Sequence, residues 1–205
     1  PVHKDYIFKY LVSIQNHPTT DLFFGGVQYE HTKPKKEKIL RWVYGKKREA
    51  KTQEYRKIKT PSAIFSSNTL YKKEAFLEIN IFTENYYGLD NIISNVIKQQ
   101  NKQVLHIDNN AYHLGLESSK EYICKVEKSI QTLFDFEQRG VIKNNDFKIQ
   151  KIYLQLKKLY LINLINLLYK TTKPLIFSNL SSYYPILILL DFYKLNIYIA
   201  LKKNE

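Results

Sequence analysis

Apolar side chains in the first thirty residues follow two successive patterns. Along residues 5–15 they recur every three to four positions, which predicts a helix ending at Asn16-His17-Pro18. Residues 21–29 then form a nearly continuous apolar run, which predicts a buried strand. Gly25 and Gly26 interrupt this run and could let a ligand approach the backbone, or could form a bulge or turn.

The next thirty residues are polar and strongly cationic. Residues 31–59 contain a single short apolar patch, so the pattern predicts a loop with one or two helical turns. Such a basic run is either a solvated face or a loop that closes over a phosphate. Residues 62–71 are strand-like, and residues 72–79 begin a short helix.

Short strands and helices alternate in the central part of the chain. Gly88 precedes Asp90 and Asn91, which have the character of a helix start, and residues 92–97 supply one apolar helical face. A short strand is predicted over residues 103–107, followed by a turn at 108–110 and a second strand over 111–114. This alternation predicts a mixed α/β domain.

Residues 118–137 return to helical periodicity, with Ser118 or Ser119 as the N-cap. The predicted inward positions are Tyr122, Ile123, Val126, Ile130, Leu133 and Phe134. Cys124 occupies an apolar position of the same helix, so we expect it to be a packed core residue.

The composition shifts near Asp146, where an amphipathic helix with lysines on one side begins. Pro174 is predicted to break it. The following apolar segment, residues 183–203, is interrupted by Asp191, Lys194 and Asn196, which argues against a membrane-spanning helix. The tail helices either pack on the domain or lie in a membrane interface with their lysines toward anionic headgroups.

Composition limits the classes of function. With 205 residues and 44% hydrophobic residues, the chain can bury one sizeable core with an appended element. The net charge of +13 suits nucleic acid, an anionic membrane or a phosphorylated substrate, but also a lysine-rich proteome. A single cysteine excludes an internal disulfide and a multi-cysteine zinc site, and fits a reducing compartment. No base-stacking motif occurs, so nucleic acid is not an expected partner.

Two residues of the central stretch are candidates for chemistry. Asp90 at a helix N-terminus would stay ionised and could accept a proton, although an aspartate there is commonly a helix cap. His113 at a strand end is a metal ligand only if partners join it, and a lone histidine is commonly structural. Zinc-hydrolase, dinucleotide-binding and P-loop motifs are all missing from the sequence. The residues alone therefore indicate a basic α/β domain with a carboxylate and a histidine.

Six sequence blocks occur in a familiar order. They are GGVQYE, LRWVYGKKRE, a following arginine, SSNTLYKKEAF, YYGLDN and VLHIDNNAYHLGLE. This order resembles family 2 glycosyltransferases over residues 1–139. The resemblance implies a partial GT-A-like mixed sheet flanked by helices in residues 1–140, followed by an amphipathic helical tail in residues 141–205.

The resemblance also implies an activity. The expected reaction transfers a sugar from a UDP- or GDP-sugar to a hydroxyl of a glycan or lipid-linked acceptor, with inversion, in cell-surface polysaccharide or glycolipid synthesis. A divalent metal, Mn²⁺ or Mg²⁺, would screen the leaving diphosphate. The expected location is cytoplasmic, with peripheral attachment to the inner face of the plasma membrane as an extension.

The matching positions nominate site residues. Asn91 stands where the family carries its usual base, so Asp90 would have to serve as the base. His113 is the implied metal or diphosphate ligand. The implied substrate-binding residues are Gly25, Gly26, Arg48, Glu49, Arg56, Asn68 and Gly88.

The chain departs from the family pattern in two ways. The acidic DxD metal motif is expected before Pro1, so the metal ligands would be partly missing from this chain. The change of the acidic pair to Asp90-Asn91 also removes the usual base, since an amide cannot accept a proton. That change motivates an alternative: a degenerate, non-catalytic module that binds a glycan or a membrane surface.

Overall fold

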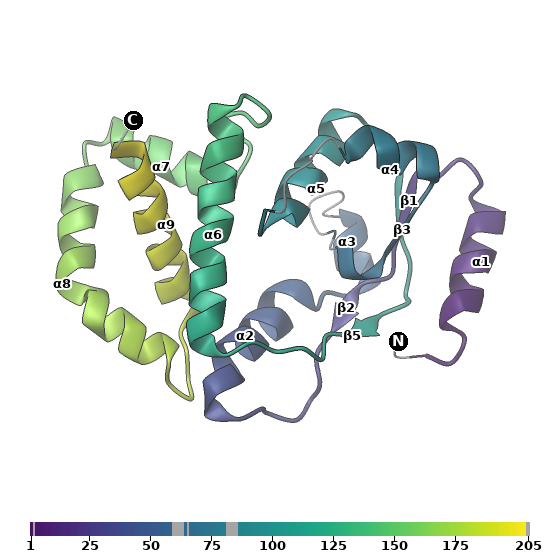
Figure 1. The fold of residues 1–205 in the computed structure, drawn as a ribbon, viewed down its shortest axis with the longest axis horizontal. Coiled ribbons are helices and arrows are strands. Elements are labelled where there is room, and N and C mark those ends of the chain that lie inside the picture. Colours follow the sequence, from purple (N-terminus) through teal and green to yellow (C-terminus); the bar gives the residue numbers. More distant parts are fainter. Residues whose placement is uncertain (2, 59–63, 65, 81–85, 204–205) are drawn as a thin grey trace. The chain divides into compact units, whose positions relative to one another are not determined.

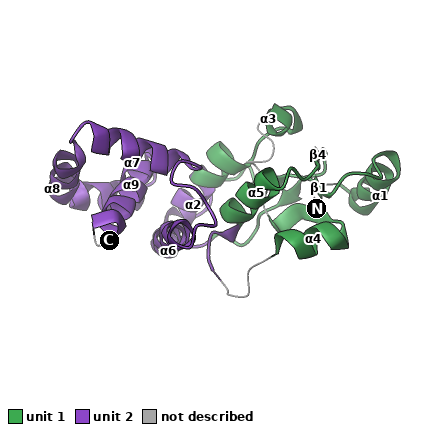
Figure 2. Cartoon of the chain, turned by 90° about the horizontal axis from the view of Figure 1, so that it is seen from above, with its two compact units in different colours: residues 1–33, 44–85, 90–116 green, residues 34–43, 86–89, 117–205 purple. Residues whose placement is uncertain are grey.

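The structure is a computed structural model that describes residues 1, 3–58, 64, 66–80 and 86–203 (Figure 1). It is mixed α/β, as predicted, and rich in helix, with a small mixed sheet and a two-stranded parallel sheet. The chain forms two compact units (Figure 2). Unit 1 contains residues 1–33, 44–85 and 90–116, and unit 2 contains residues 34–43, 86–89 and 117–205.

A three-stranded sheet forms the centre of unit 1. Strand β1 (Leu22–Phe24) lies in the middle, antiparallel to β3 (Thr69–Tyr71) and parallel to β4 (Val104–His106). A second, two-stranded sheet pairs β2 (Val27–Gln28) with β5 (Ala111–Tyr112) in parallel. The predicted strand over residues 21–29 is therefore two strands, divided at Gly25-Gly26.

Every residue of β1 is buried, since the central strand of this sheet is covered by other parts of unit 1. Tyr10 of α1 (Tyr6–Asn16) packs against Phe23 and Ile107 in one apolar cluster. Unit 1 also contains α3 (Gln53–Ile58), α4 (Lys73–Ile79) and α5 (Leu89–Gln99, whose first residue belongs to unit 2). In α5, the predicted apolar face is buried through Ile92, Val96 and Ile97.

The cationic segment was wrongly predicted to be largely loop. It forms the 3₁₀ turn η1 (Lys36–Lys38), helix α2 (Ile39–Tyr44), the π-helical turn η2 (Gly45–Glu49) and α3. Ile39 and Leu40 are fully buried, so the short apolar patch anchors a helix despite its lysine-rich surroundings. Of the predicted strand over 62–71, residues 62, 63 and 65 lie outside the described residues. The rest contains η3 (Ser66–Asn68) and β3.

Unit 2 is built on α6 (Ser119–Gln138), α7 (Lys148–Lys158), α8 (Ile162–Leu180) and α9 (Leu187–Lys203). Helix α9 packs against each of the other three (Figure 1). A capping box between Ser118 and Glu121 fixes the start of α6, as the sequence predicted for Ser118. The prediction for Cys124 was wrong: its side chain is exposed. Phe136 rather than Phe134 is the last buried aromatic residue of α6.

The tail helix does not break at Pro174, contrary to the prediction, because α8 continues through it. Proline removes the hydrogen bond to the carbonyl four residues earlier. Both Pro174 and Lys170 are exposed, so water can hydrogen-bond to that carbonyl.

Asn196 in α9 is buried and donates to the Phe192 carbonyl at 2.9 Å. Within the described residues, no helix has the length and apolar character to cross a bilayer.

Candidate functional site

Four of the predicted substrate-binding residues meet at one end of the three-stranded sheet. Gly25 and Gly26 follow β1, and Asn68 immediately precedes the antiparallel β3. The loop of residues 108–110 leaves the parallel β4 at the same end. Arg56 reaches this end from α3. In open α/β sheets, ligands bind beyond the carboxyl ends of the parallel strands, which is where this cluster lies.

Asn68 is the centre of the cluster and is only 3% exposed. Its amide nitrogen donates to the Gly26 carbonyl at 2.6 Å and to the Asn109 carbonyl at 2.8 Å. Its side-chain oxygen accepts from the hydroxyls of Tyr6 and Tyr10. Burial raises the pKa of Tyr10 well above its ordinary value, so this hydroxyl remains a donor. The amide thus ties α1, the glycine turn and the loop after β4 together.

Arg56 is 1% exposed and serves as a second tie. Its guanidinium donates to the carbonyls of Lys51 at 2.6 Å, Ile107 at 2.7 Å and Gly25 at 3.3 Å. It also lies 5.3 Å above the centre of the Phe24 ring. Burial lowers the pKa of Arg56, while the nearby carboxylates of Asp108 and Glu54 act in the opposite direction. Guanidinium nevertheless stays charged in proteins, so a cation is held inside unit 1.

The two glycines allow this cluster to close. Gly26 has φ +88°, and a Cβ built there would lie 2.4 Å from Arg56 Nη1 and from Asn110 Oδ1. A Cβ on Gly25 would lie 2.4 Å from the Asn109 carbonyl oxygen. Both residues therefore meet the protein's own groups at close range.

A second group of predicted residues gathers around Tyr29. The Tyr29 hydroxyl donates to Glu49, and the ring of His113 stacks on the Tyr29 ring with 5.3 Å between centroids. Gly45, at the start of η2, admits this ring, because a Cβ there would lie 2.1 Å from Tyr29 Cζ. Arg48 lies exposed on the same π-helical turn. Short π-helical turns are frequent at functional sites.

The predicted catalytic pair, Asp90 and Asn91, belongs to neither of these two clusters. Asp90 and Asn91 occupy the first turn of α5, and Asp90 Oδ1 accepts from the Ser66 backbone N–H at 3.1 Å. Asn91 is exposed. Gly88, with φ +91°, belongs to unit 2, where a Cβ would lie 2.7 Å from Ser129 Cβ. The carboxylate of Asp90 therefore keeps one oxygen that no described donor holds.

The donor set for a metal does not assemble among the described residues. No three histidine, cysteine, aspartate or glutamate side chains of that part of the chain come together as potential ligands. His113 contacts Tyr29, and its backbone N–H donates to the Gln28 carbonyl at 2.8 Å. A metal role for His113 remains a prediction.

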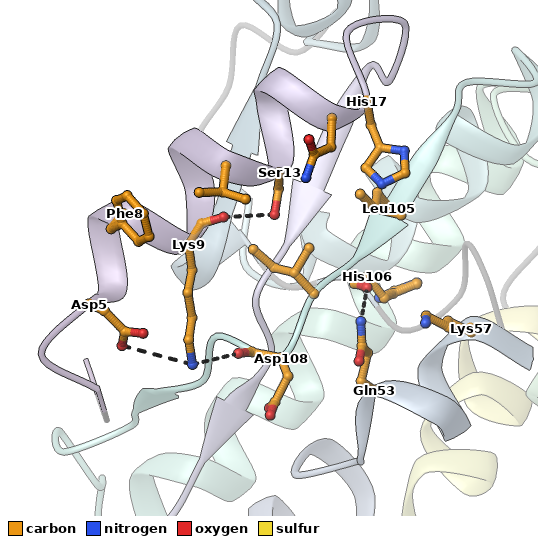
Figure 3. Close-up of a pocket in the computed structure, with 13 residues that line it drawn as sticks. Asp5, Phe8, Lys9, Ser13, His17, Gln53, Lys57, Leu105, His106 and Asp108 are labelled. Atoms are coloured by element: carbon orange, nitrogen blue, oxygen red, sulfur yellow. Dashed lines mark hydrogen bonds and ion pairs between the residues drawn. The ribbon is translucent and has the colours of Figure 1, made fainter.

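The sequence did not indicate the pocket of unit 1 shown in Figure 3, which has a volume of about 410 Å³. Helix α1, the edge strand β4 and α3 line it, and none of the predicted site residues does. Lys9 Nζ lies 3.2 Å from the Asp108 carbonyl and 3.9 Å from the Asp5 carboxylate. Gln53 Nε2 donates to the outward-facing carbonyl of His106 at 2.6 Å. The Gln53 contact satisfies one carbonyl of the edge strand β4, and the Lys9 contact holds the loop that follows it.

His106 in β4 is expected to give unit 1 a pH-dependent stability. The residue is 1% exposed, and among the described residues neither ring nitrogen has a hydrogen-bond partner. Burial, together with the charges of Arg56 and Lys57, lowers the pKa of His106 to about 4. The folded protein therefore keeps a neutral imidazole at a pH where the unfolded chain binds a proton.

We expect the free energy of unfolding of unit 1 to fall by about 3 kcal/mol as the pH drops from about 6.5 to about 4. The unfolded state binds the extra proton in this range, so stability is fully present above the unfolded pKa. Amide hydrogen exchange of β1 and β4, measured against pH, would show the slope. His106→Phe should abolish it, whereas the exposed His17→Asn should leave it; an equal slope in both variants would contradict the assignment.

The predicted site residues thus form a buried cluster at the sheet end, a cluster around Tyr29, and a separate carboxylate on α5. Sequence reasoning missed three tyrosines of these clusters: Tyr6 and Tyr10, which donate to Asn68, and Tyr29, which donates to Glu49. Their only signal was helical or strand spacing, which indicates core. Comparison with known proteins gave no match: no protein-family model, curated protein or solved structure corresponds to this chain.

Proposed function

We propose that the chain belongs to an inverting glycosyltransferase that uses a nucleotide-sugar donor. The observation that carries the proposal is the meeting of Gly25, Gly26, Asn68 and Arg56 at the carboxyl ends of β1 and β4. These residues come from separate sequence blocks, and each block resembles a donor-site block of family 2 glycosyltransferases. Their convergence at a ligand-binding edge of an α/β sheet is what the proposal requires.

In this proposal the buried side chains hold the donor site in shape. The side-chain nitrogens of Asn68 and Arg56 donate to backbone carbonyls, so other groups would contact the nucleotide-sugar directly. The exposed Arg48 supplies a charge that suits a diphosphate. The half-buried ring of His113 lies in the cluster around the buried Tyr29, on whose ring it stacks. The acceptor would be a hydroxyl of a glycan or a lipid-linked glycan.

Asp90 is the base in this proposal. It lies in the first turn of α5, and the Ser66 backbone N–H holds one of its oxygens. The other carboxylate oxygen would take the proton of the acceptor hydroxyl while the hydroxyl oxygen of the acceptor attacks the anomeric carbon. The bond to the nucleoside diphosphate breaks at the same centre, and the diphosphate leaves with the electron pair.

Asp90→Asn is the test of this role. Asparagine keeps an oxygen for the Ser66 N–H, so the fold is preserved, but it cannot accept a proton. We expect the rate of sugar transfer to fall by about a hundredfold or more. The assay is nucleotide release from a panel of UDP- and GDP-sugars with Mn²⁺ or Mg²⁺, in the presence of acceptor. Glu74→Gln, another first-turn acid on an exposed helix, should leave the rate unchanged.

The exposed Asn91 favours a second candidate, a non-catalytic module that binds glycan. The same panel separates the two candidates. Metal-dependent nucleotide binding and turnover support the transferase, whereas glycan binding without nucleotide binding or turnover supports the module. An unchanged rate in Asp90→Asn, with turnover present, would remove Asp90 as the base while leaving the transferase proposal intact.

A further inference from the structure

We propose that the α7–α8 face of unit 2 docks onto an anionic lipid bilayer. This inference does not depend on the proposed glycosyl transfer. It rests on the exposure of apolar side chains on α8, on the charge of the segment, and on the corner between the two helices. The α7–α8 face is defined here by Lys157, Lys158, Tyr160, Leu164, Leu167, Leu168 and Leu175.

Helix α8 is apolar on the side that faces away from the helices of unit 2. Its packed side presents Ile176 and Leu180 to the core, and α9 lies against it (Figure 1). Four leucines lie on the other side, at spacings typical of one helical face. They are Leu164, Leu167, Leu168 and Leu175, with exposures of 51%, 59%, 47% and 71%. A helix that is apolar on two sides has a second surface that needs cover.

The positive charge of residues 147–190 favours an anionic bilayer over a second copy of the chain as the partner of this face. Residues 147–190 contain six lysines and neither aspartate nor glutamate. Two copies of the chain joined through this face would bring the lysines of both copies into one interface with no acidic residue of the segment to pair with them, because a twofold interface uses the same surface patch twice. An anionic bilayer instead accepts leucine side chains below its headgroups and lysines among them. Charge complementarity therefore favours a membrane surface over self-association.

The corner between α7 and α8 adds a recess for a lipid headgroup. An open hollow of about 830 Å³ is lined by Lys157 and Lys158 at the end of α7 and by Ile162 and Asn163 at the start of α8. Tyr160 turns this corner with φ +60° and is 93% exposed. Left-handed backbone is unfavourable for tyrosine, and such strain concentrates at functional positions. Tyrosine favours the polar-apolar boundary of membranes, and two lysines suit a lipid phosphate.

Vesicle co-sedimentation of the whole chain tests the proposal. We expect the protein to pellet with vesicles of phosphatidylcholine and phosphatidylglycerol, but not with phosphatidylcholine alone. Leu164→Asn/Leu168→Asn/Leu175→Asn should weaken binding at least about tenfold. Lys157→Gln/Lys158→Gln should weaken it about fivefold per lysine removed. Far-UV circular dichroism of each variant should match the parent, since all five side chains are exposed.

Matched variants on unit 1 separate a specific face from general basicity. Ile7→Asn/Phe8→Asn/Leu11→Asn removes equally exposed apolar residues from α1, and Lys73→Gln/Lys98→Gln removes two exposed lysines. Both should keep parental binding. The proposal is overturned if these controls lose binding as much as the α7–α8 variants, or if the parent shows no preference for anionic vesicles. It is also overturned if the leucine variant merely dissociates a dimer.

Discussion

Arg56→Met is expected to lower the free energy of unfolding of unit 1 by about 3–5 kcal/mol. The substitution strands the carbonyls of Lys51, Gly25 and Ile107, which the guanidinium now satisfies inside the protein. Each buried carbonyl that loses its donor costs about 1–3 kcal/mol. Methionine fills much of the volume and retains packing against Phe24, so the cost is mainly that of lost hydrogen bonds.

Amide hydrogen exchange would locate this loss. Protection of β1 and β4 should fall in Arg56→Met, while the helices α6–α9 of unit 2 keep theirs. Lys57→Met, at the exposed neighbouring position of α3, should change protection little. Arg56→Lys should not restore the parental protection of β1 and β4, because an ammonium cannot span three separated carbonyls as a planar guanidinium does. Parental protection in Arg56→Met would show that these bonds contribute no net stability.

Arg56 also marks where sequence reasoning stopped. A basic run such as residues 31–59 is typical of a solvated face, and nothing in its spacing separates Arg56 from the lysines around it. Its partners are backbone carbonyls, which leave no trace in side-chain patterns. The resemblance placed Arg56 with the glycines and Asn68, and the structure brings these residues together. What the resemblance could not supply is that their side chains are turned inward.

Local patterns predicted the elements well where burial is one-sided. Helices α1, α5 and α6 lie close to their expected ranges because their apolar stripes are regular. The prediction for residues 31–59 was wrong because two buried residues, Ile39 and Leu40, decide the structure of a segment crowded with lysines. The prediction of a break at Pro174 was wrong because α8 tolerates the proline where both Pro174 and Lys170 are exposed and water can reach the Lys170 carbonyl.

The inward turn of Asn68 and Arg56 refines the proposed site. The cluster fixes the backbone of Gly25-Gly26 relative to the loop of residues 108–110. A rigid backbone at the sheet end is what a donor pocket needs, since misplacement of a site by about 1 Å is costly to catalysis. In the proposed transfer the cluster would therefore contribute by positioning, while the proposed base, Asp90, lies on α5.

Arg41→Met is expected to lower the free energy of unfolding of unit 2 by about 3–5 kcal/mol. Arg41 is 6% exposed, its Nε lies 3.4 Å from Glu117 Oε2, and its guanidinium lies 5.2 Å above the Tyr122 ring. These contacts join α2 to the start of α6. Removing the cation leaves the largely buried Glu117 carboxylate with one remaining partner, Lys125. The side chain of Lys125 is more exposed than that of Glu117. A buried charge that loses a partner is strongly destabilising.

The same contacts give Glu117 a pH signature that identifies the cause. Burial alone would raise the pKa of Glu117, but the hydrogen bond from Lys125 and the charge of Arg41 hold it below its ordinary value. The stability this carboxylate contributes is therefore present at neutral pH and lost as the pH falls through its depressed pKa. Without Arg41 the pKa rises, so the loss in acid should begin at a higher pH.

Urea unfolding followed by Trp42 fluorescence reports on this region, because Trp42 is the single tryptophan and adjoins Arg41. Lys38→Met removes an exposed cation from the preceding turn and should leave both the midpoint and its pH dependence unchanged. Arg41→Met/Glu117→Gln should recover part of the stability lost in Arg41→Met, since an amide tolerates burial better than an unpaired carboxylate. If the double variant is no more stable than Arg41→Met, the loss comes from packing on Tyr122 rather than from the ion pair.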